Sequence, residues 1–279
     1  MPTFTIDGCA IRYEILGDGP PVVLTPGGRV GGEGLRPLAE KVAKSHRVLL
    51  WDRRNTGASD IWIGGEGSEQ EQWSDDLVAL LDHLDMAPAY VGGGSAGCRN
   101  SLLTALRHPE AVKGLLLWSP TGGPYACQVL GYDYHVPYIR AAQADSMAAV
   151  AETPFFAERI AANPSNRDRL MAMDPEAFIT VMKRWNTFFY HREDRPLIGV
   201  TEEQLRSLNV PTLIFEGRDY LHTPEASATL HRCISGSELL PSPWTVDEWT
   251  ALYTGKTPGS PMSLYERMAE PMLEFLGRR

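Results

Sequence analysis

The distribution of apolar positions along the chain predicts short buried strands that alternate with amphipathic helices. Continuous apolar runs at Val22–Thr25, Val48–Trp51 and Leu115–Trp118 are too short for helices and favour buried strands. Gln70–Leu84 instead repeats its apolar residues at steps of three and four, which predicts a helix. Strands that alternate with helices indicate an α/β fold with a mostly parallel sheet covered on both faces. Further strands are expected at Thr3–Ile6, Ile11–Ile15, Tyr90–Val91 and Thr212–Phe215, and a further helix at Asn100–Leu106.

One long span interrupts this alternation. Between Trp118 and Pro211 no strand pattern occurs, and the span is rich in aromatic residues and helical patterns. The sequence therefore predicts an α/β core of residues 1–119 and 209–279 with a helical lid, residues 120–208, inserted into it. Most of the aromatic side chains are expected to pack the lid itself. The candidates for substrate contact in the lid are Tyr134, His135 and Trp185, and its expected helices are Ile139–Val150, Pro154–Ala162, Pro175–Trp185 and Glu202–Leu208.

A glycine-flanked serine lies between a predicted strand and a predicted helix. Gly93, Ser95 and Gly97 match the pattern G-x-S-x-G, in which small neighbours allow a sharp turn. Such a turn places the serine hydroxyl at the carboxyl edge of the sheet. The backbone N–H of Ala96 would then lie at a helix N-terminus, where positive partial charge favours an oxyanion. Ser95 is therefore the candidate nucleophile.

With this motif in that context, the chain resembles the α/β-hydrolase superfamily over nearly its whole length. Residues 52–59, DRRNTGAS, are similar to the D-x-R-G-x-G-x-S loop of the superfamily, and residues 210–219, VPTLIFEGRD, to its acid-bearing strand. The resemblance implies the α/β-hydrolase fold: a mostly parallel central sheet flanked by helices, with an inserted helical cap. It does not select a substrate, because this fold hosts many reactions.

The loop after Val22–Thr25 is expected to supply the second oxyanion donor. The family usually has His-Gly there, whereas this chain continues with Pro26, Gly27 and Gly28. Because proline has no N–H, Gly28 is the candidate donor beside Ala96. Arg29 follows, and two interpretations stay open: a clamp for a substrate carboxylate, or a solvated surface arginine.

A serine nucleophile needs a base and an orienting acid, which follow it in this fold in the order acid, then histidine. Asp219 is the best candidate acid. The family usually has its acid three residues after the glycine, which would be position 220, so Asp219 lies one position early. The usual histidine after the last strand is missing, because residues 241–249 read PSPWTVDEW. After Asp219 the chain has only His222 and His231. His222 is the candidate base, and the alternative is a loop residue that caps the next helix.

Composition narrows the class of protein further. The chain has 279 residues, with 26 basic and 35 acidic side chains and a formal charge of −9, which argues against a nucleic-acid or membrane-surface binder. No signal peptide or membrane span is recognised, and four scattered cysteines without metal-ligand spacing favour a reducing, cytoplasmic location. We expect no metal and no cofactor, and a small-molecule substrate as the partner. The oligomeric state stays open, with a homodimer as one alternative.

Three functional hypotheses follow from these residues. The first is a cofactor-independent hydrolase of a small ester, lactone or activated C–C bond that uses Ser95, His222 and Asp219. The second is a lyase, decarboxylase or isomerase on the same fold, since the polar pocket could stabilise an enolate without the usual histidine. The third is a catalytically silent ligand-binding member. The distance from the Ser95 hydroxyl to the nearest imidazole nitrogen discriminates between the first and the others.

Overall fold

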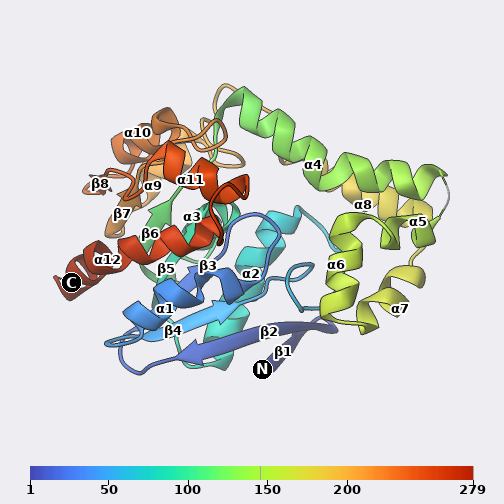
Figure 1. Ribbon diagram of the computed structural model, residues 1–279, viewed down its shortest axis with the longest axis horizontal. Coiled ribbons are helices and arrows are strands. Elements are labelled where there is room, and N and C mark those ends of the chain that lie inside the picture. Colours follow the sequence, from blue (N-terminus) through green and yellow to red (C-terminus); the bar gives the residue numbers. More distant parts are fainter. Residues whose placement is uncertain (145, 279) are drawn as a thin grey trace.

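An eight-stranded sheet forms the centre of the computed structural model, which describes residues 1–144 and 146–278 (Figure 1). The strand order across the sheet is β1-β2-β4-β3-β5-β6-β7-β8. The pairs β1–β2 and β2–β4 are antiparallel, and all the other neighbouring pairs are parallel. The strands are β1 (Thr3–Ile6), β2 (Cys9–Leu16), β3 (Pro21–Thr25), β4 (Arg47–Trp51), β5 (Ala89–Gly94), β6 (Val112–Trp118), β7 (Thr212–Phe215) and β8 (Glu238–Leu240).

Helices cover both faces of this sheet, as the continuous apolar strands predict. Val23 and Leu115 belong to the hydrophobic cluster on one face, together with side chains of α2 (Glu69–His83) and α3 (Ala96–Arg107). Their chain neighbours Val22 and Leu116 belong to the cluster on the other face, with side chains of α1 (Arg36–Val42) and α12 (Ala269–Gly277). Because successive side chains of a strand point to opposite faces, both positions must be apolar in these strands.

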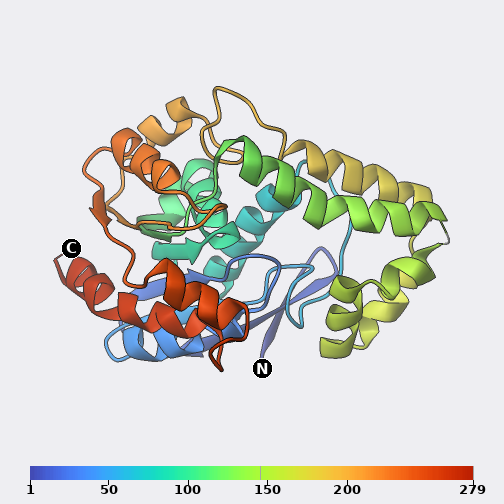
Figure 2. The same ribbon diagram turned by 45° about the horizontal axis from the view of Figure 1, so that its top comes forward.

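A group of helices between β6 and β7 projects from one side of the sheet (Figures 1 and 2). Within this group α4 packs along α8. The helix expected at Ile139–Val150 is wrong as a single element: one helix ends at Ala144 and another begins at Met147, with residue 145 outside the described part. The helices are α4 (Gly123–Ala144), α5 (Met147–Ala151), α6 (Pro154–Ala162), α7 (Ser165–Met171) and α8 (Pro175–Thr187).

The last part of the expected lid packs on the core. Leu197, Val200 and Leu205 join the hydrophobic cluster of α2 and α3. Glu202 in α9 (Glu202–Ser207) also pairs with Arg232 in α10 (Pro224–Cys233) at 3.1 Å. The division of the chain at residues 120–208 stays a prediction.

Shorter elements complete the described chain. The 3-10 helices are η1 (Gly32–Leu35), η2 (Pro109–Ala111) and η3 (Pro261–Met268), and the remaining α-helix is α11 (Val246–Tyr253). Among the described helices, none combines the length and the apolar character that crossing a bilayer would need.

Candidate active site

Ser95 occupies the sharp turn between β5 and α3. Its backbone φ is +54°, a conformation that non-glycine residues rarely adopt and that turns its side chain out of the strand. The Ser95 N–H donates to the carbonyls of Trp118 (3.2 Å) and Ser119 (3.1 Å), which hold the turn in place. A Cβ atom on Gly97 would lie 2.1 Å from the carbonyl oxygen of Thr25, so this position needs glycine. The G-x-S-x-G pattern thus has a local steric cause.

The structure brings Ser95, His222 and Asp219 together. The Nε2 atom of His222 lies 2.9 Å from Ser95 Oγ, and its Nδ1 atom lies 2.7 Å from Asp219 Oδ2. When the Nδ1–H group donates to the carboxylate, the Nε2 lone pair faces the serine hydroxyl and can accept its proton. The His222 side chain is only 14% exposed, which limits competition from water for these hydrogen bonds.

The loop after β7 explains how an aspartate and a histidine three residues apart can meet. Asp219 Oδ1 accepts hydrogen bonds from the backbone N–H groups of Leu221 (2.8 Å) and His222 (2.9 Å). The Asp219 N–H in turn donates to the His222 carbonyl at 3.1 Å, which closes the turn. Burial raises the pKa of Asp219, but the hydrogen bonds from the His222 ring and from the two backbone N–H groups lower it, and the pKa lies below its usual value. The carboxylate is therefore ionised at neutral pH.

Aromatic residues follow β8, where the family usually carries its histidine. Trp244 is buried, and its ring lies 5.3 Å from the ring of Tyr265 and 5.9 Å from that of Trp249. Trp244 and Trp249 line a small recess that also reaches Asp219 and Ser119. In this chain the segment after β8 therefore contributes apolar packing beside the acid.

The loop after β3 lies directly against Ser95. A Cβ atom on Gly27 would lie 3.2 Å from the Ser95 Cβ atom, so Gly27 borders the serine side chain and Gly28 follows it in the loop. Arg53, which is fully buried, donates from Nη2 to the carbonyls of Gly27 (3.3 Å) and Gly28 (3.0 Å). The N–H of Ala96, in the first turn of α3, has no partner within the helix. Ala96 and the loop of Gly27 and Gly28 thus lie beside Ser95, and the role of the Ala96 and Gly28 N–H groups as oxyanion donors stays a prediction.

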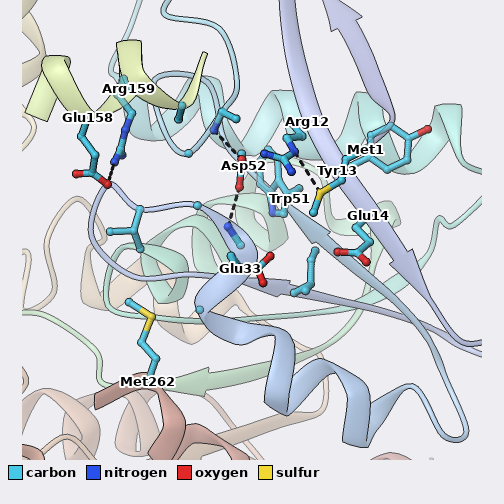
Figure 3. Close-up of a pocket in the computed structure, with 18 residues that line it drawn as sticks. Met1, Arg12, Tyr13, Glu14, Glu33, Trp51, Asp52, Glu158, Arg159 and Met262 are labelled. Carbon is cyan, nitrogen blue, oxygen red and sulfur yellow. Dashed lines mark hydrogen bonds and ion pairs between the residues drawn. The ribbon is translucent and has the colours of Figure 1, made fainter. Parts of the chain in front are cut away.

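Asp52 holds the far end of the same loop. Its Oδ1 atom accepts from the Gly32 N–H at 2.7 Å and its Oδ2 atom from the Ala58 N–H at 2.8 Å (Figure 3). Beside Asp52 a pocket of about 310 Å³ opens between the middle of β2, η1 and helix α6. Its lining includes Trp51, Arg159 and Met262 but none of Ser95, Asp219 and His222. This pocket is separate from the candidate catalytic group.

Arg29 is not a solvated surface residue, so that interpretation is wrong. It is only 6% exposed and forms a buried ion pair with Glu69. Its Nη1 atom donates to the Tyr134 carbonyl at 3.1 Å, and its guanidinium carbon lies 5.1 Å from the ring centroid of Tyr134 and 5.0 Å from that of Phe155. The sequence did not reveal the burial of Arg29, because its carboxylate partner comes from α2, forty residues later in the chain.

The other lid candidates lie at different depths. Tyr134 packs against Phe189, with ring centroids 5.6 Å apart, and stays partly buried. His135 is buried, with Nδ1 bonded to the Gly131 carbonyl at 3.0 Å. Trp185 lies in the hydrophobic cluster that packs the lid helices together. Contact of these three residues with a substrate stays a prediction.

Sequence reasoning missed two buried arginines beside Ser95. Arg53 hydrogen-bonds to the loop after β3. The sequence signal that could have identified it is its position within the D-x-R-G-like segment. Arg99 lies one helical turn after Ser95, and its Nη1 atom hydrogen-bonds to Thr121 Oγ1. An arginine four residues after a candidate nucleophile is a usable signal in the sequence. In the first turn of a helix that starts at the sheet edge it is expected to be buried, and a buried arginine usually has a specific partner.

Comparison with known proteins supports the fold. Residues 20–174 match the family model described as "alpha/beta hydrolase fold". In Bacillus subtilis, the protein named "Uncharacterized hydrolase YraK" is 33% identical over 118 residues, which are 42% of this chain. The match spans only 44% of the length of YraK.

Two further proteins are similar over most of the chain. The protein named "Putative carbamate hydrolase RutD" from Azorhizobium caulinodans is 28% identical over 79% of this chain and 81% of its own length. The crystal structure of the enol-lactonase from Burkholderia xenovorans LB400 superimposes with a TM-score of 0.63 at 22% identity. That superposition covers 99% of this chain and 100% of the other, and at this identity it shows a common fold.

Proposed function

Because the chain belongs to the α/β-hydrolase fold family, we propose that it is a serine-dependent hydrolase of a small ester, lactone or activated C–C bond. The observation that carries this proposal is the pair of distances at His222: 2.9 Å from Nε2 to Ser95 Oγ and 2.7 Å from Nδ1 to Asp219 Oδ2. These contacts supply a nucleophile, a base and an orienting acid in one hydrogen-bonded series.

The proposed reaction on an ester or lactone has two halves. Ser95 Oγ attacks the carbonyl carbon while its proton passes to His222 Nε2, and Asp219 stabilises the imidazolium that forms. The N–H groups of Ala96 and Gly28 hold the oxyanion of the tetrahedral intermediate. His222 then gives the proton to the leaving oxygen, and the C–O bond of the substrate breaks. Water, activated by His222, releases the acyl group from Ser95 and regenerates the hydroxyl.

Two kinds of evidence support the proposal beyond the distances. The relatives named as hydrolases include one similar to 79% of this chain. In addition, Ser95 keeps a positive φ that the turn imposes and that exposes the nucleophile in this fold. A residue in a strained conformation persists where the surrounding structure enforces it, and such residues cluster at active sites.

The test compares the wild type with Ser95→Ala on 4-nitrophenyl acetate and butyrate. We expect turnover by the wild type, its loss in Ser95→Ala, and labelling of Ser95 by a fluorophosphonate. Ser207→Ala, on the exposed helix α9, is the matched control and should keep wild-type activity. Equal turnover in Ser95→Ala would overturn the proposal. Turnover of another substrate without fluorophosphonate labelling would favour a lyase or isomerase, and a ligand returned unchanged would favour a silent binding protein.

A further inference from the structure

Three buried arginines belong to the segments that meet at the Ser95 turn. They come from the loop after β3 (Arg29), the loop after β4 (Arg53) and the first turn of α3 (Arg99). Their exposed fractions are 6%, 0% and 1%. Arg53 donates to the carbonyls of the loop that touches Ser95, and the Arg99 N–H donates to the Ser95 carbonyl at 3.1 Å. Arg53 therefore contacts the loop beside Ser95, Arg99 lies one helical turn after Ser95, and Arg29 follows that loop in the chain.

The described carboxylates around these groups do not balance their charge. Glu69 pairs with Arg29 and also accepts from Asn55 Nδ2 at 2.9 Å. Asp52, which also acts on Arg53, already accepts from two backbone N–H groups. Burial lowers the pKa of Arg53 to about 10, so this group stays charged at neutral pH. Three guanidinium groups against two carboxylates leave one positive charge uncompensated, and a buried unpaired charge is costly.

Other charged pairs nearby do not change this balance. Arg54 forms a buried pair with Asp76, and Arg159 pairs with Glu158. Each pair is neutral as a whole. The excess positive charge therefore lies within the set of Arg29, Arg53 and Arg99.

The same region holds buried N–H donors that lack an acceptor among the described residues. Such donors normally find a partner, because leaving one unpaired in the interior costs about 1–3 kcal/mol. The arginine and Gln70 atoms among them are all donors, so a ligand that complements them is an acceptor; Asn100 Oδ1, next to Arg99 in the chain, is a buried acceptor without a partner among the described residues. The atoms are Arg29 Nε, Arg53 Nε and Nη1, Gln70 Nε2 and Arg99 Nη2, and the Arg99 side chain also interacts with Tyr134.

From this charge and donor pattern we propose that the substrate carries a carboxylate, which binds to Arg53 and Arg99 while the scissile carbonyl lies at Ser95. The inference rests on the proposed hydrolase function and narrows its substrate to acidic esters or lactones. A single negative charge compensates the single excess positive charge, and a planar carboxylate matches the fork of a guanidinium. Phe189, whose ring centroid lies 5.4 Å from the Arg99 guanidinium, provides an apolar wall for the body of the substrate.

The test uses two esters that differ only in charge. Mono-4-nitrophenyl adipate carries a terminal carboxylate, and its neutral counterpart carries a primary amide in the same place. We expect wild-type kcat/KM to be about tenfold or more higher for the acidic ester, since a hydrogen-bonded charge contributes more than a neutral group. The corresponding pair of suberate esters, which have a longer chain, tests whether the carboxylate binds farther from Ser95. High salt should weaken the preference only slightly, because the arginines are buried.

Variants then assign the preference to the arginines. In Arg99→Met the ratio of kcat/KM values, acidic over neutral, should fall to about one, mainly through KM of the acidic ester, and Arg99→Lys should retain part of it. Arg107→Met, in the same helix but on its surface, is the matched control and should keep the wild-type ratio. If Arg99→Met does not fold, the wild-type preference and the binding of adipate to Ser95→Ala by calorimetry still decide the matter.

The outcomes separate this inference from the proposed function. Ser95-dependent turnover with no preference for the acidic ester would overturn the inference and leave the hydrolase proposal standing. Absence of Ser95-dependent turnover for both esters, with Arg99-dependent binding of adipate, would overturn the hydrolase proposal and leave the carboxylate site standing. A preference that survives in Arg99→Met and Arg53→Met alike would place the carboxylate elsewhere and overturn the assignment.

Discussion

His222 and Asp219 form two kinds of hydrogen bond within one four-residue turn. The carboxylate accepts from the His222 ring through Oδ2 at 2.7 Å and from the His222 backbone N–H through Oδ1 at 2.9 Å. The ring is thus aimed by the same side chain that closes the turn carrying it. Acid and base come from one loop after β7, so the hydrogen bonds that align them are local to that loop.

Replacing His222 tests its proposed role as the base. His222→Gln should lower kcat/KM for 4-nitrophenyl butyrate by about a thousandfold or more, because no other group then accepts the Ser95 proton. Steady-state kinetics and the rate of fluorophosphonate labelling provide the measurement. His231→Gln is the matched control, since His231 lies on α10 and bonds to Ser237 Oγ. Comparable losses in both variants would argue against the assignment.

Asp219 is expected to have separable orienting and structural roles. Asp219→Asn keeps an oxygen for the backbone N–H groups of Leu221 and His222 but presents an amide N–H₂ to the ring. The ring would then adopt the wrong tautomer, and kcat should fall by about a thousandfold or more with little change in melting temperature. Asp219→Ala should lose the turn as well and melt at a lower temperature. Thermal unfolding followed by circular dichroism, together with kcat, distinguishes the two effects. Full activity in Asp219→Asn would contradict the role of Asp219 in orienting the His222 ring.

The core of the fold could be predicted from the sequence because local pattern and tertiary environment agree there. Strands β1 and β7 and helix α6 have the expected bounds, since short apolar runs and a proline at the first helical turn are local signals. The long α4 was missed at its start, where Gly123, Pro124 and Tyr125 are weak helix formers. Its packing along α8 is a tertiary contact that no local pattern reveals.

The candidate site was predictable where its chemistry depends on neighbours in sequence. Ser95 was proposed from a motif, Asp219 from its place after a predicted strand, and His222 from the order of acid and histidine along the chain. The environment of Arg29 was not, because Glu69 and Tyr134 approach it from distant segments. Arginine burial depends on such long-range pairing, so composition and periodicity could not indicate it.

The buried ion pair of Arg54 and Asp76 should be important for stability rather than for catalysis. Their side chains are 3% and 1% exposed, so Arg54→Met leaves a buried carboxylate without its partner and should cost about 3–5 kcal/mol of unfolding free energy. The double variant Arg54→Met/Asp76→Leu should lose clearly less than the sum of the single losses. The exposed pair of Arg107 and Asp75 is the comparison, and Arg107→Met should cost about 1 kcal/mol or less. Urea unfolding measures each value, and strict additivity of the two buried changes would refute this coupling.

His135 should make the protein less stable in mild acid. Burial, followed by the charge of Arg29, lowers the pKa of His135 to about 3, whereas an unfolded histidine titrates near pH 6.5. Between these values the unfolded chain binds a proton that the folded protein excludes, so stability falls as the pH drops from about 6.5 toward 3. This group alone contributes a slope of up to about 1.4 kcal/mol per pH unit. His135→Asn, which can keep a donor to the Gly131 carbonyl, should flatten the dependence of the unfolding free energy on pH between 7 and 4.5. Urea unfolding of both proteins across that range provides the comparison, and parallel curves would show that His135 is protonated without unfolding.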